Sequence, residues 1–289
     1  MKGEGGSDIE NEAALAGQSF GIAGARQFAL EGEDGRRWRI MTWAPDTEPP
    51  DGGFPVLYVL DANAVFATVV EMVRFQCRGK DPLIPVAVIG IGYETDFPLD
   101  AARRYYDYTV YASPDELPRT KEPRQWPENG GADAFLAFLE SEVKPFAARQ
   151  FPVHPQRQAL FGHSLGGFLA LYAFLSRREA FQVYGACSPS VWWKDDYLLK
   201  WALRLEAEQE KEANGVETMG LLLAVGTKEL PDMIEGARRM HDHLAAAMLP
   251  GLVLRFRELE GEAHCSAVFP ALGTWYRFAS GMWGYPGDF

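Results

Sequence analysis

The sequence lacks the segments that mark secreted and membrane-spanning chains. No run of about 18 apolar residues occurs in it, so no transmembrane helix is predicted. Residues 1–8 are mostly small or polar and do not form the apolar core of a secretory signal. The only cysteines, Cys77, Cys187 and Cys265, are odd in number and far apart, which argues against a disulfide framework or a zinc site. We therefore expect a cytoplasmic protein with free thiols.

Basic residues are also in short supply. The chain has 28 Lys and Arg against 40 Asp and Glu, a net charge of -12, which is unfavourable for binding nucleic acid or an anionic membrane. Cofactor signals are missing as well: there is no dinucleotide glycine fingerprint, no phosphate loop and no clustered set of metal ligands. We predict a protein without a metal or cofactor of its own, whose partner is a small molecule.

Apolar runs alternate with helical patterns along most of the 289 residues. Buried strands are predicted at 55–60, 84–93, 181–187, 221–226 and 252–259, and helices at 133–151, 198–205 and 234–248. An earlier hairpin, 27–30 with 38–43, turns at Asp34 and Gly35. This alternation predicts a mostly parallel sheet with helices on both faces and an antiparallel hairpin at its start. We expect a mobile tail over 1–17 and a single α/β domain over 18–289.

The clearest chemical signal is the stretch 158–167. A short apolar run leads into Gly-His-Ser-Leu-Gly (162–166), and an apolar helix pattern follows. A serine on such a strand-to-helix turn is the nucleophile elbow of α/β-hydrolases, so Ser164 is the predicted nucleophile. Gly162 is expected to make room before the turn, and Gly166 where the helix packs on the sheet. The N–H of Leu165 lies at the start of the new helix and is expected to stabilise an oxyanion.

A serine hydroxyl needs a base, which is usually a histidine oriented by an acid. His264 follows the last predicted strand and comes after the serine in chain order, as α/β-hydrolases require, so it is the predicted base. His163, inside the elbow, is expected to point away from the serine. The remaining histidines are expected at the surface: His154, His241 and His243.

The acid is expected in the loop after the strand at 221–226. Glu229 is the first candidate and Asp232 the second. Lys228 could instead pair with Glu229 at the surface, and Glu262 could approach the histidine locally. A Ser-His dyad without an acid is a further alternative.

Other candidates follow predicted strands at the carboxyl edge of the sheet, where ligands gather in parallel sheets. The loop after the strand at 55–60 is expected to give the second oxyanion donor, the N–H of Ala62. Arg104 is expected either to face the cleft or to pair with Asp107 in a solvated loop. Trp192 and Trp193 are expected either to line an apolar wall or to cap the core. Residues 113–131, rich in proline and charge, predict a long loop on the same side.

Several of these stretches together resemble one family. They are LYVLDANA (57–64), RYYDYT (104–109), GADAF (131–135), GHSLGG (162–167), SPSVWW (188–193) and EAH (262–264). In combination they resemble the esterase D type α/β-hydrolases, particularly the trilactone siderophore esterases that open ferric enterobactin, salmochelin or bacillibactin. The resemblance covers roughly residues 25–280.

The resemblance implies an α/β-hydrolase fold and assigns roles to particular residues. It makes Ser164 the nucleophile and His264 the base, and it includes Ser-His dyads, which lowers the weight on Glu229. It further implies oxyanion donors at Ala62 and Leu165, a contact from Arg104 to an anionic catecholate, and a cleft bordered by Trp192 and Trp193. Any iron would belong to the substrate.

Two features depart from that family. It usually has glycine where this chain has Ala62, which puts the freedom of that turn in question. Its periplasmic members carry a signal, and a net charge of -12 is not suited to attract a highly anionic substrate.

We predict a serine esterase that hydrolyses carboxylic esters through an acyl-enzyme, with a siderophore trilactone as the first candidate substrate. The alternative is a general carboxylesterase or an S-formylglutathione-hydrolase-like thioesterase. An acyltransferase would use the same elbow, whereas a non-catalytic binding protein would normally have lost the serine or the histidine.

Overall fold

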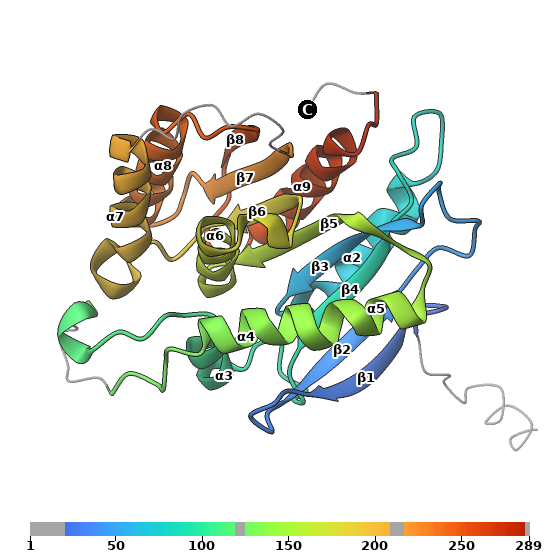
Figure 1. The fold of residues 1–289 in the computed structure, drawn as a ribbon, viewed down its shortest axis with the longest axis horizontal. Coiled ribbons are helices and arrows are strands. Elements are labelled where there is room, and N and C mark those ends of the chain that lie inside the picture. Colours follow the sequence, from blue (N-terminus) through green and yellow to red (C-terminus); the bar gives the residue numbers. More distant parts are fainter. Residues whose placement is uncertain (1–20, 119–124, 209–216, 287–289) are drawn as a thin grey trace, which may run out of the picture.

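The computed structural model describes residues 21–118, 125–208 and 217–286, and its centre is one eight-stranded sheet (Figure 1). The strand order is β1-β2-β4-β3-β5-β6-β7-β8. The strands are β1 (Arg26–Glu31), β2 (Arg37–Trp43), β3 (Phe54–Leu60), β4 (Ala87–Gly92), β5 (Val153–His163), β6 (Val183–Cys187), β7 (Met219–Gly226) and β8 (Leu252–Leu259). The first two pairings are antiparallel and all others are parallel, which confirms the predicted sheet and hairpin.

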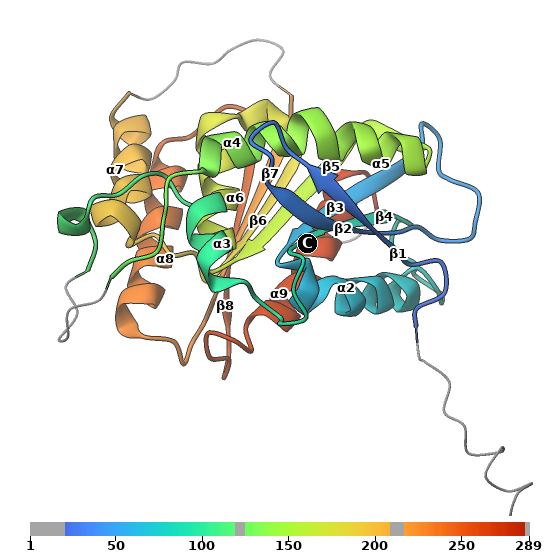
Figure 2. The ribbon, with the colours of Figure 1, turned by 90° about the horizontal axis from the view of Figure 1, so that it is seen from below.

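Helices cover both faces of this sheet. They are α2 (Ala62–Gln76), α3 (Ala101–Asp107), α4 (Ala132–Phe138), α5 (Lys144–Gln150), α6 (Leu165–Ser176), α7 (Trp193–Glu208), α8 (Pro231–Ala246) and α9 (Val268–Met282). Figure 2 shows α2 and α9 on one side of the sheet and α4, α5 and α6 on the other. Each side has its own apolar cluster, one around Val69 and Trp275 and the other around Phe135 and Phe168. Because both faces are covered, β3, β4 and β6 are buried at every position.

The helix predicted at 133–151 is a single rod with a wider turn in its middle. A π-helical turn, η2 (Leu139–Val143), joins α4 to α5. Pro145 follows that turn and has no N–H to donate, so the regular hydrogen-bond ladder is interrupted there. The rod still presents one continuous apolar face, with Phe135, Leu139 and Val143 buried.

Three of these helices, α2, α3 and α9, were not predicted from the sequence. Of these, α2 packs on β4 and β3, α9 on β5, β6 and β7, and α3 on α4 and α6. Short 3-10 turns complete the described elements, at η1 (Pro114–Glu116) and η3 (Arg178–Ala180). The predicted tail over 1–17 lies outside the described residues, as does part of the loop at 113–131. None of the described helices is both long and apolar enough to cross a membrane.

Candidate active site

Ser164 occupies a sharp turn between β5 and α6. Its φ of 60° and ψ of -116° are unusual for a residue with a side chain, and such strain is often stored at functional sites. Gly162 makes the turn possible, because a Cβ there would lie 2.0 Å from the carbonyl oxygen of Gly166. A Cβ on Gly166 would meet only ordinary contacts, the nearest at 3.5 Å, whereas one on Gly167 would lie 2.9 Å from the Cys187 carbonyl. The close packing expected at Gly166 therefore occurs at Gly167.

The main chain around Ser164 is held by the loop that follows β6. The Ser164 N–H donates to the carbonyl of Cys187 at 2.9 Å, and its carbonyl accepts from the Ser190 N–H at 3.1 Å. Within the described residues, the Ser164 hydroxyl has one hydrogen-bond partner, Ser190 Oγ at 3.5 Å. That contact is long, so the hydroxyl is free to turn toward another group, and catalytic hydrogen bonds commonly tighten only when substrate binds.

His264, in the turn after β8, is held by a buried carboxylate. Its Nδ1 lies 2.7 Å from Glu229 Oε2, and the Glu229 side chain is 0% exposed. The other oxygen, Oε1, accepts from the N–H of Gly226 at 2.8 Å and from the hydroxyl of Ser188. Burial works to raise the pKa of Glu229, but the hydrogen bonds from His264, Ser188 and Gly226 outweigh it and lower the pKa below its ordinary value. The carboxylate is therefore charged and fixed in orientation.

The alternative acids are placed elsewhere. Asp232 is exposed in the first turn of α8. Among the described residues, Lys228 forms no ion pair with Glu229, and Glu262 contacts this region through its carbonyl, which accepts from the Lys228 N–H at 2.9 Å. Glu229 is thus the acid that the fold brings to His264.

The helices that follow β3 and β5 each begin with a backbone N–H group at the carboxyl edge of the sheet. Ala62 and Leu165 are the first residues of α2 and α6, and in the described part of the chain their N–H groups have no hydrogen-bond partner. Such groups at helix starts are suited to bind a developing negative charge. Both belong to strand-to-helix turns at the carboxyl edge, one after β3 and one after β5.

Alanine fits at position 62 because the strained residue is the one before it. Asp61 has the left-handed conformation, with φ 54° and ψ 40°, so glycine is not required at 62. The Ala62 methyl lies over Gly90 of β4, where a Cβ would come within 2.7 Å of it. The adjacent Asn63 accepts from the Tyr93 N–H at 2.8 Å and donates to the Thr95 carbonyl at 2.8 Å, which ties the turn to the end of β4.

His163 connects the elbow to the loop that carries the base. Its Nε2 donates to the carbonyl of His264 at 2.8 Å, and the two imidazole rings lie 4.7 Å apart. Burial, helped by the neighbouring His264, lowers the pKa of His163 to about 4. Its imidazole is therefore neutral at ordinary pH.

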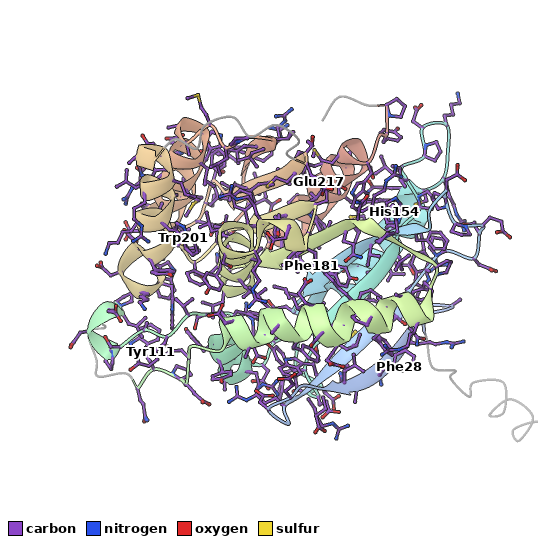
Figure 3. The ribbon with its side chains drawn as sticks, viewed as in Figure 1. Phe28, Tyr111, His154, Phe181, Trp201 and Glu217 are labelled. Atoms are coloured by element: carbon purple, nitrogen blue, oxygen red, sulfur yellow. The ribbon has the colours of Figure 1, made fainter. Side chains whose placement is uncertain are left out.

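The other histidines are half-buried rather than fully exposed. His154 is near the start of β5, where its Nδ1 accepts from the Arg157 N–H at 3.2 Å. Figure 3 places it at the far end of the molecule from Tyr111. His241 stacks on Phe256, with ring centroids 5.2 Å apart, and His243 Nδ1 contacts Glu206 at 2.7 Å.

Arg104 is placed differently from either expectation. Its side chain is only 10% exposed and forms an ion pair with Asp61, with Nε 2.6 Å from Oδ1. The predicted alternative pairing with Asp107 is wrong, because Asp107 pairs with Arg103 at 3.4 Å. The Arg104 guanidinium is thus bound within the protein, behind the turn that carries Ala62.

The two tryptophans after β6 have different environments. Trp193 is 0% exposed and donates from Nε1 to the Val110 carbonyl at 2.9 Å, so its predicted place beside a substrate cleft is wrong and the core alternative holds. Trp192 is half-buried and lies 6.3 Å, centroid to centroid, from Trp126, which is also half-buried. Tyr105 joins the same aromatic cluster, 6.0 Å from Trp126.

Ser188, Ser190 and Trp126 were not predicted from the sequence to take part in the site. The two serines belong to the SPS run after β6, where Ser188 contacts the acid and Ser190 contacts the nucleophile. Both serines follow the carboxyl end of a predicted strand, and this position could have identified them as candidate site residues. Trp126 lies within the long loop at 113–131, and no local pattern distinguishes it.

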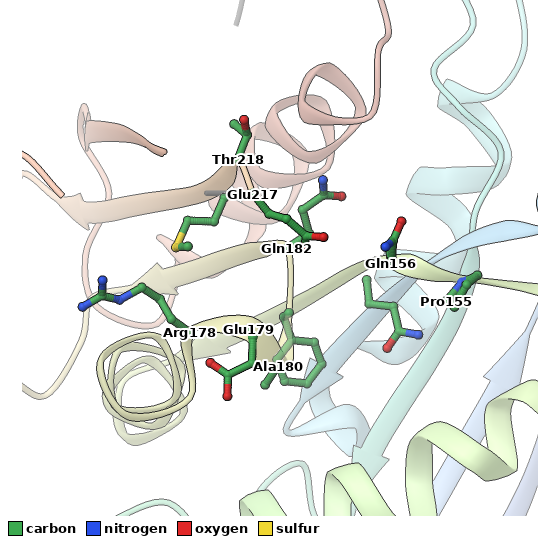
Figure 4. A pocket seen from close by; sticks show the side chains of 11 residues that line it. Pro155, Gln156, Arg178, Glu179, Ala180, Gln182, Glu217 and Thr218 are labelled. Carbon is green, nitrogen blue, oxygen red and sulfur yellow. The ribbon is translucent and has the colours of Figure 1, made fainter. Parts of the chain in front are cut away.

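A separate hollow lies at the opposite edge of the sheet. It has a volume of about 370 Å³ and is lined by residues at the amino ends of β5, β6 and β7, including Gln156, Gln182 and Thr218 (Figure 4). It shares no lining residue with the Ser164 group. Across the described ranges, no group of three or more His, Cys, Asp and Glu side chains is arranged to hold a metal ion.

The chain as a whole can be compared with known proteins. A family model described as "Putative esterase" matches residues 33–257. The chain belongs to this esterase family. The esterase is 38% identical over 251 residues to the ferri-bacillibactin esterase BesA of Bacillus subtilis (strain 168). The aligned region covers 85% of this chain and 86% of the relative.

A second relative of the esterase is fungal. The siderophore triacetylfusarinine C esterase of Aspergillus fumigatus is 31% identical over 274 residues, covering 86% of this chain and 90% of the relative. Among solved structures, the BES protein from Bacillus cereus is similar with a TM-score of 0.84 at 32% identity, covering 92% of this chain and 99% of that one. The esterase therefore has the predicted α/β-hydrolase fold and is an enzyme that acts on ester bonds.

Proposed function

We propose that this esterase is a serine hydrolase that opens the ester backbone of a siderophore through an acyl-enzyme. The observation that carries the chemistry is the charged Glu229 bound to Nδ1 of His264, together with the N–H groups of Ala62 and Leu165, which have no hydrogen-bond partner among the described residues. The substrate class is supported by the relatives, which are named as esterases of bacillibactin and triacetylfusarinine C.

The proposed reaction begins at Ser164. Because Nδ1 of His264 is bound to Glu229, its Nε2 is the nitrogen that takes the hydroxyl proton as Ser164 attacks the ester carbonyl. The N–H groups of Ala62 and Leu165 then stabilise the tetrahedral oxyanion. His264 returns the proton to the leaving alcohol, and water activated by the same imidazole releases the acid. The Glu229 charge stabilises the imidazolium in both steps.

The half-buried pair Trp192 and Trp126 supports an aromatic contact to the substrate. Trp192 lies in the loop after β6 and Trp126 within the long loop at 113–131, and both side chains are partly exposed. Aromatic faces bind ring-bearing ligands such as catecholates. The iron of a ferric siderophore would enter as part of the substrate.

The test compares kcat/KM for a ferric trilactone siderophore with that for p-nitrophenyl esters of increasing acyl length, with Ser164→Ala as the blank. We expect the trilactone to be preferred by at least about 10²-fold and Ser164→Ala to abolish turnover. Turnover of simple esters alone would leave a general carboxylesterase or a thioesterase, and full activity of Ser164→Ala would reject the serine mechanism. Added acceptor alcohols in the same assay separate an acyltransferase from a hydrolase.

We also propose that the enzyme works in the cytoplasm. The three cysteines are free thiols, Cys187 buried and Cys265 exposed, and free thiols persist in reducing compartments. Cell fractionation with an antibody to the chain tests this proposal, and recovery in the periplasmic or secreted fraction would reject it.

A further inference from the structure

The buried guanidinium of Arg104 joins the two turns that carry the N–H groups of Ala62 and Leu165. Arg104, in α3, donates from Nε to Asp61 Oδ1 at 2.6 Å and from Nη2 to Asp61 Oδ2 at 3.0 Å. The same Nη2 lies 3.4 Å from the carbonyl oxygen of His163. Asp61 immediately precedes Ala62, and His163 immediately precedes Ser164. The Arg104 side chain therefore contacts both turns directly.

Both turns contain strained backbone that needs outside support. Asp61 and Ser164 each have a positive φ, 54° and 60°, which is unfavourable for a residue with a side chain. The Asp61 carboxylate does not cap its own helix, so it does not hold the turn by itself. The backbone N–H of Asp61 donates to the Tyr108 hydroxyl at 3.2 Å, and Tyr108 follows α3 directly. The segment around α3 thus holds the Asp61 turn through both its side chain and its main chain.

The ion pair between Arg104 and Asp61 requires a donor that is always charged and can bind both carboxylate oxygens at once. Burial opposes the charge on Arg104, but Asp61 outweighs it and raises the pKa of the guanidinium above its ordinary value. A planar guanidinium can bind both carboxylate oxygens and still offer an N–H to a third oxygen, which a lysine ammonium does with poorer geometry. Removing either partner would leave the other charge buried without compensation.

We propose that Arg104, acting through Asp61 and the His163 carbonyl, is a positioning residue that sets the spacing of the Ala62 and Leu165 N–H groups in the oxyanion hole. An oxyanion hole acts only when its donors lie at hydrogen-bond distance from the developing charge, so a small displacement is costly. This role replaces the direct contact to an anionic substrate expected from the sequence. The inference rests on the proposed acyl-transfer chemistry, and it holds for any ester substrate.

The experiment measures kcat and KM for Arg104→Lys and Asp61→Asn on an uncharged ester, p-nitrophenyl acetate, and on a ferric trilactone siderophore. Asp61→Asn is the sharper variant, because asparagine tolerates the left-handed conformation and keeps the side-chain shape. We expect both variants to lower kcat by about 10- to 100-fold on both substrates with little change in KM. Arg103→Lys, one residue away and paired with Asp107, is the matched control and should retain the wild-type kcat.

A transition-state analogue gives an independent reading. A trifluoromethyl ketone forms a serine adduct whose oxyanion occupies the hole, so its inhibition constant should rise by about the same factor as kcat falls. Thermal unfolding verifies that each variant is folded, and Asp61→Asn carries the test if Arg104→Lys does not fold.

The outcomes separate the two roles of Arg104. A raised KM confined to the anionic siderophore, with unchanged kcat on p-nitrophenyl acetate, would show a direct substrate contact and overturn the inference. An unchanged kcat for folded Asp61→Asn on both substrates would also overturn it. Failure of the proposed function is distinguishable, because it appears as activity retained by Ser164→Ala or as no turnover of the trilactone by the wild type.

Discussion

His264 Nδ1 and Glu229 Oε2 lie 2.7 Å apart, although the two residues belong to loops after different strands, β8 and β7. Glu229 is held by two further donors, the Gly226 N–H and the Ser188 hydroxyl. This arrangement favours a Ser-His-Glu triad over a dyad in which the histidine acts without an acid.

Replacing the acid tests that distinction. Glu229→Gln removes the charge that stabilises the imidazolium, and we expect kcat to fall by about 10²- to 10⁴-fold at neutral pH. Asp232→Asn, an exposed carboxylate in the next helix, is the matched control and should have wild-type kcat. A loss of less than tenfold in Glu229→Gln would instead indicate a functional dyad.

The glycines of the elbow should respond differently to alanine. Gly162→Ala places a Cβ 2.0 Å from the Gly166 carbonyl, so we expect it to lower the free energy of unfolding by at least about 2 kcal/mol and to abolish activity. Gly166→Ala meets no atom closer than 3.5 Å and lies in a helix, so its stability should be unchanged or higher by up to about 1 kcal/mol. Urea unfolding of the two variants measures both effects, and equal destabilisation would contradict this account of the turn.

His163 should make the fold sensitive to moderate acid. Burial lowers its pKa from 6.5 to about 4, so between these pH values the unfolded chain binds a proton that the folded protein does not. Stability from this residue is present above pH 6.5 and is lost as the pH falls toward 4. The loss is roughly 3 kcal/mol at most, since one pKa unit corresponds to about 1.4 kcal/mol.

The measurement is the free energy of unfolding against pH for wild type and His163→Gln, which keeps an N–H donor for the His264 carbonyl. We expect the wild-type curve to fall more steeply between pH 6.5 and 4. His241→Gln is the control and should follow the wild type. Parallel curves for all three proteins would show that His163 titrates alike in both states.

The two adjacent tryptophans should separate stability from substrate binding. Trp193 is fully buried, so Trp193→Ala should cost about 3–5 kcal/mol in unfolding free energy. Trp192→Ala should cost on the order of 1 kcal/mol and raise the KM for a catecholate siderophore by about 3- to 10-fold, leaving p-nitrophenyl acetate unaffected. If Trp192→Ala leaves the siderophore KM unchanged, the aromatic wall lies elsewhere, with Trp126 as the next residue to replace.

The sequence by itself determined the elements with strong local patterns. The last strand was predicted at 252–259 and is observed over the same residues, because its ends are set by local turn and apolar signals. The elbow around Ser164 was equally readable, since its glycines and the change from strand to helix are neighbours in the chain. In α2, apolar residues do recur at helical spacing, at Val65, Val69 and Val73, but these residues are β-branched, which lowers helix propensity and weakens the helix signal. In α9, Pro270 and Gly273 weaken the helix signal, because proline and glycine have the lowest helix propensities.

Only the tertiary structure decided which distant side chains meet. Whether Glu229 or Asp232 faces His264, and whether Arg104 pairs with Asp61 or Asp107, depends on how loops from separate strands converge at one edge of the sheet. Two tryptophans adjacent in the chain differ in burial for the same reason, because Tyr105 of α3 and Trp126 pack against Trp193, which also donates to the Val110 carbonyl. Local sequence patterns specify backbone conformation, but the pairing of charges and the burial of side chains follow from contacts between residues far apart in the chain.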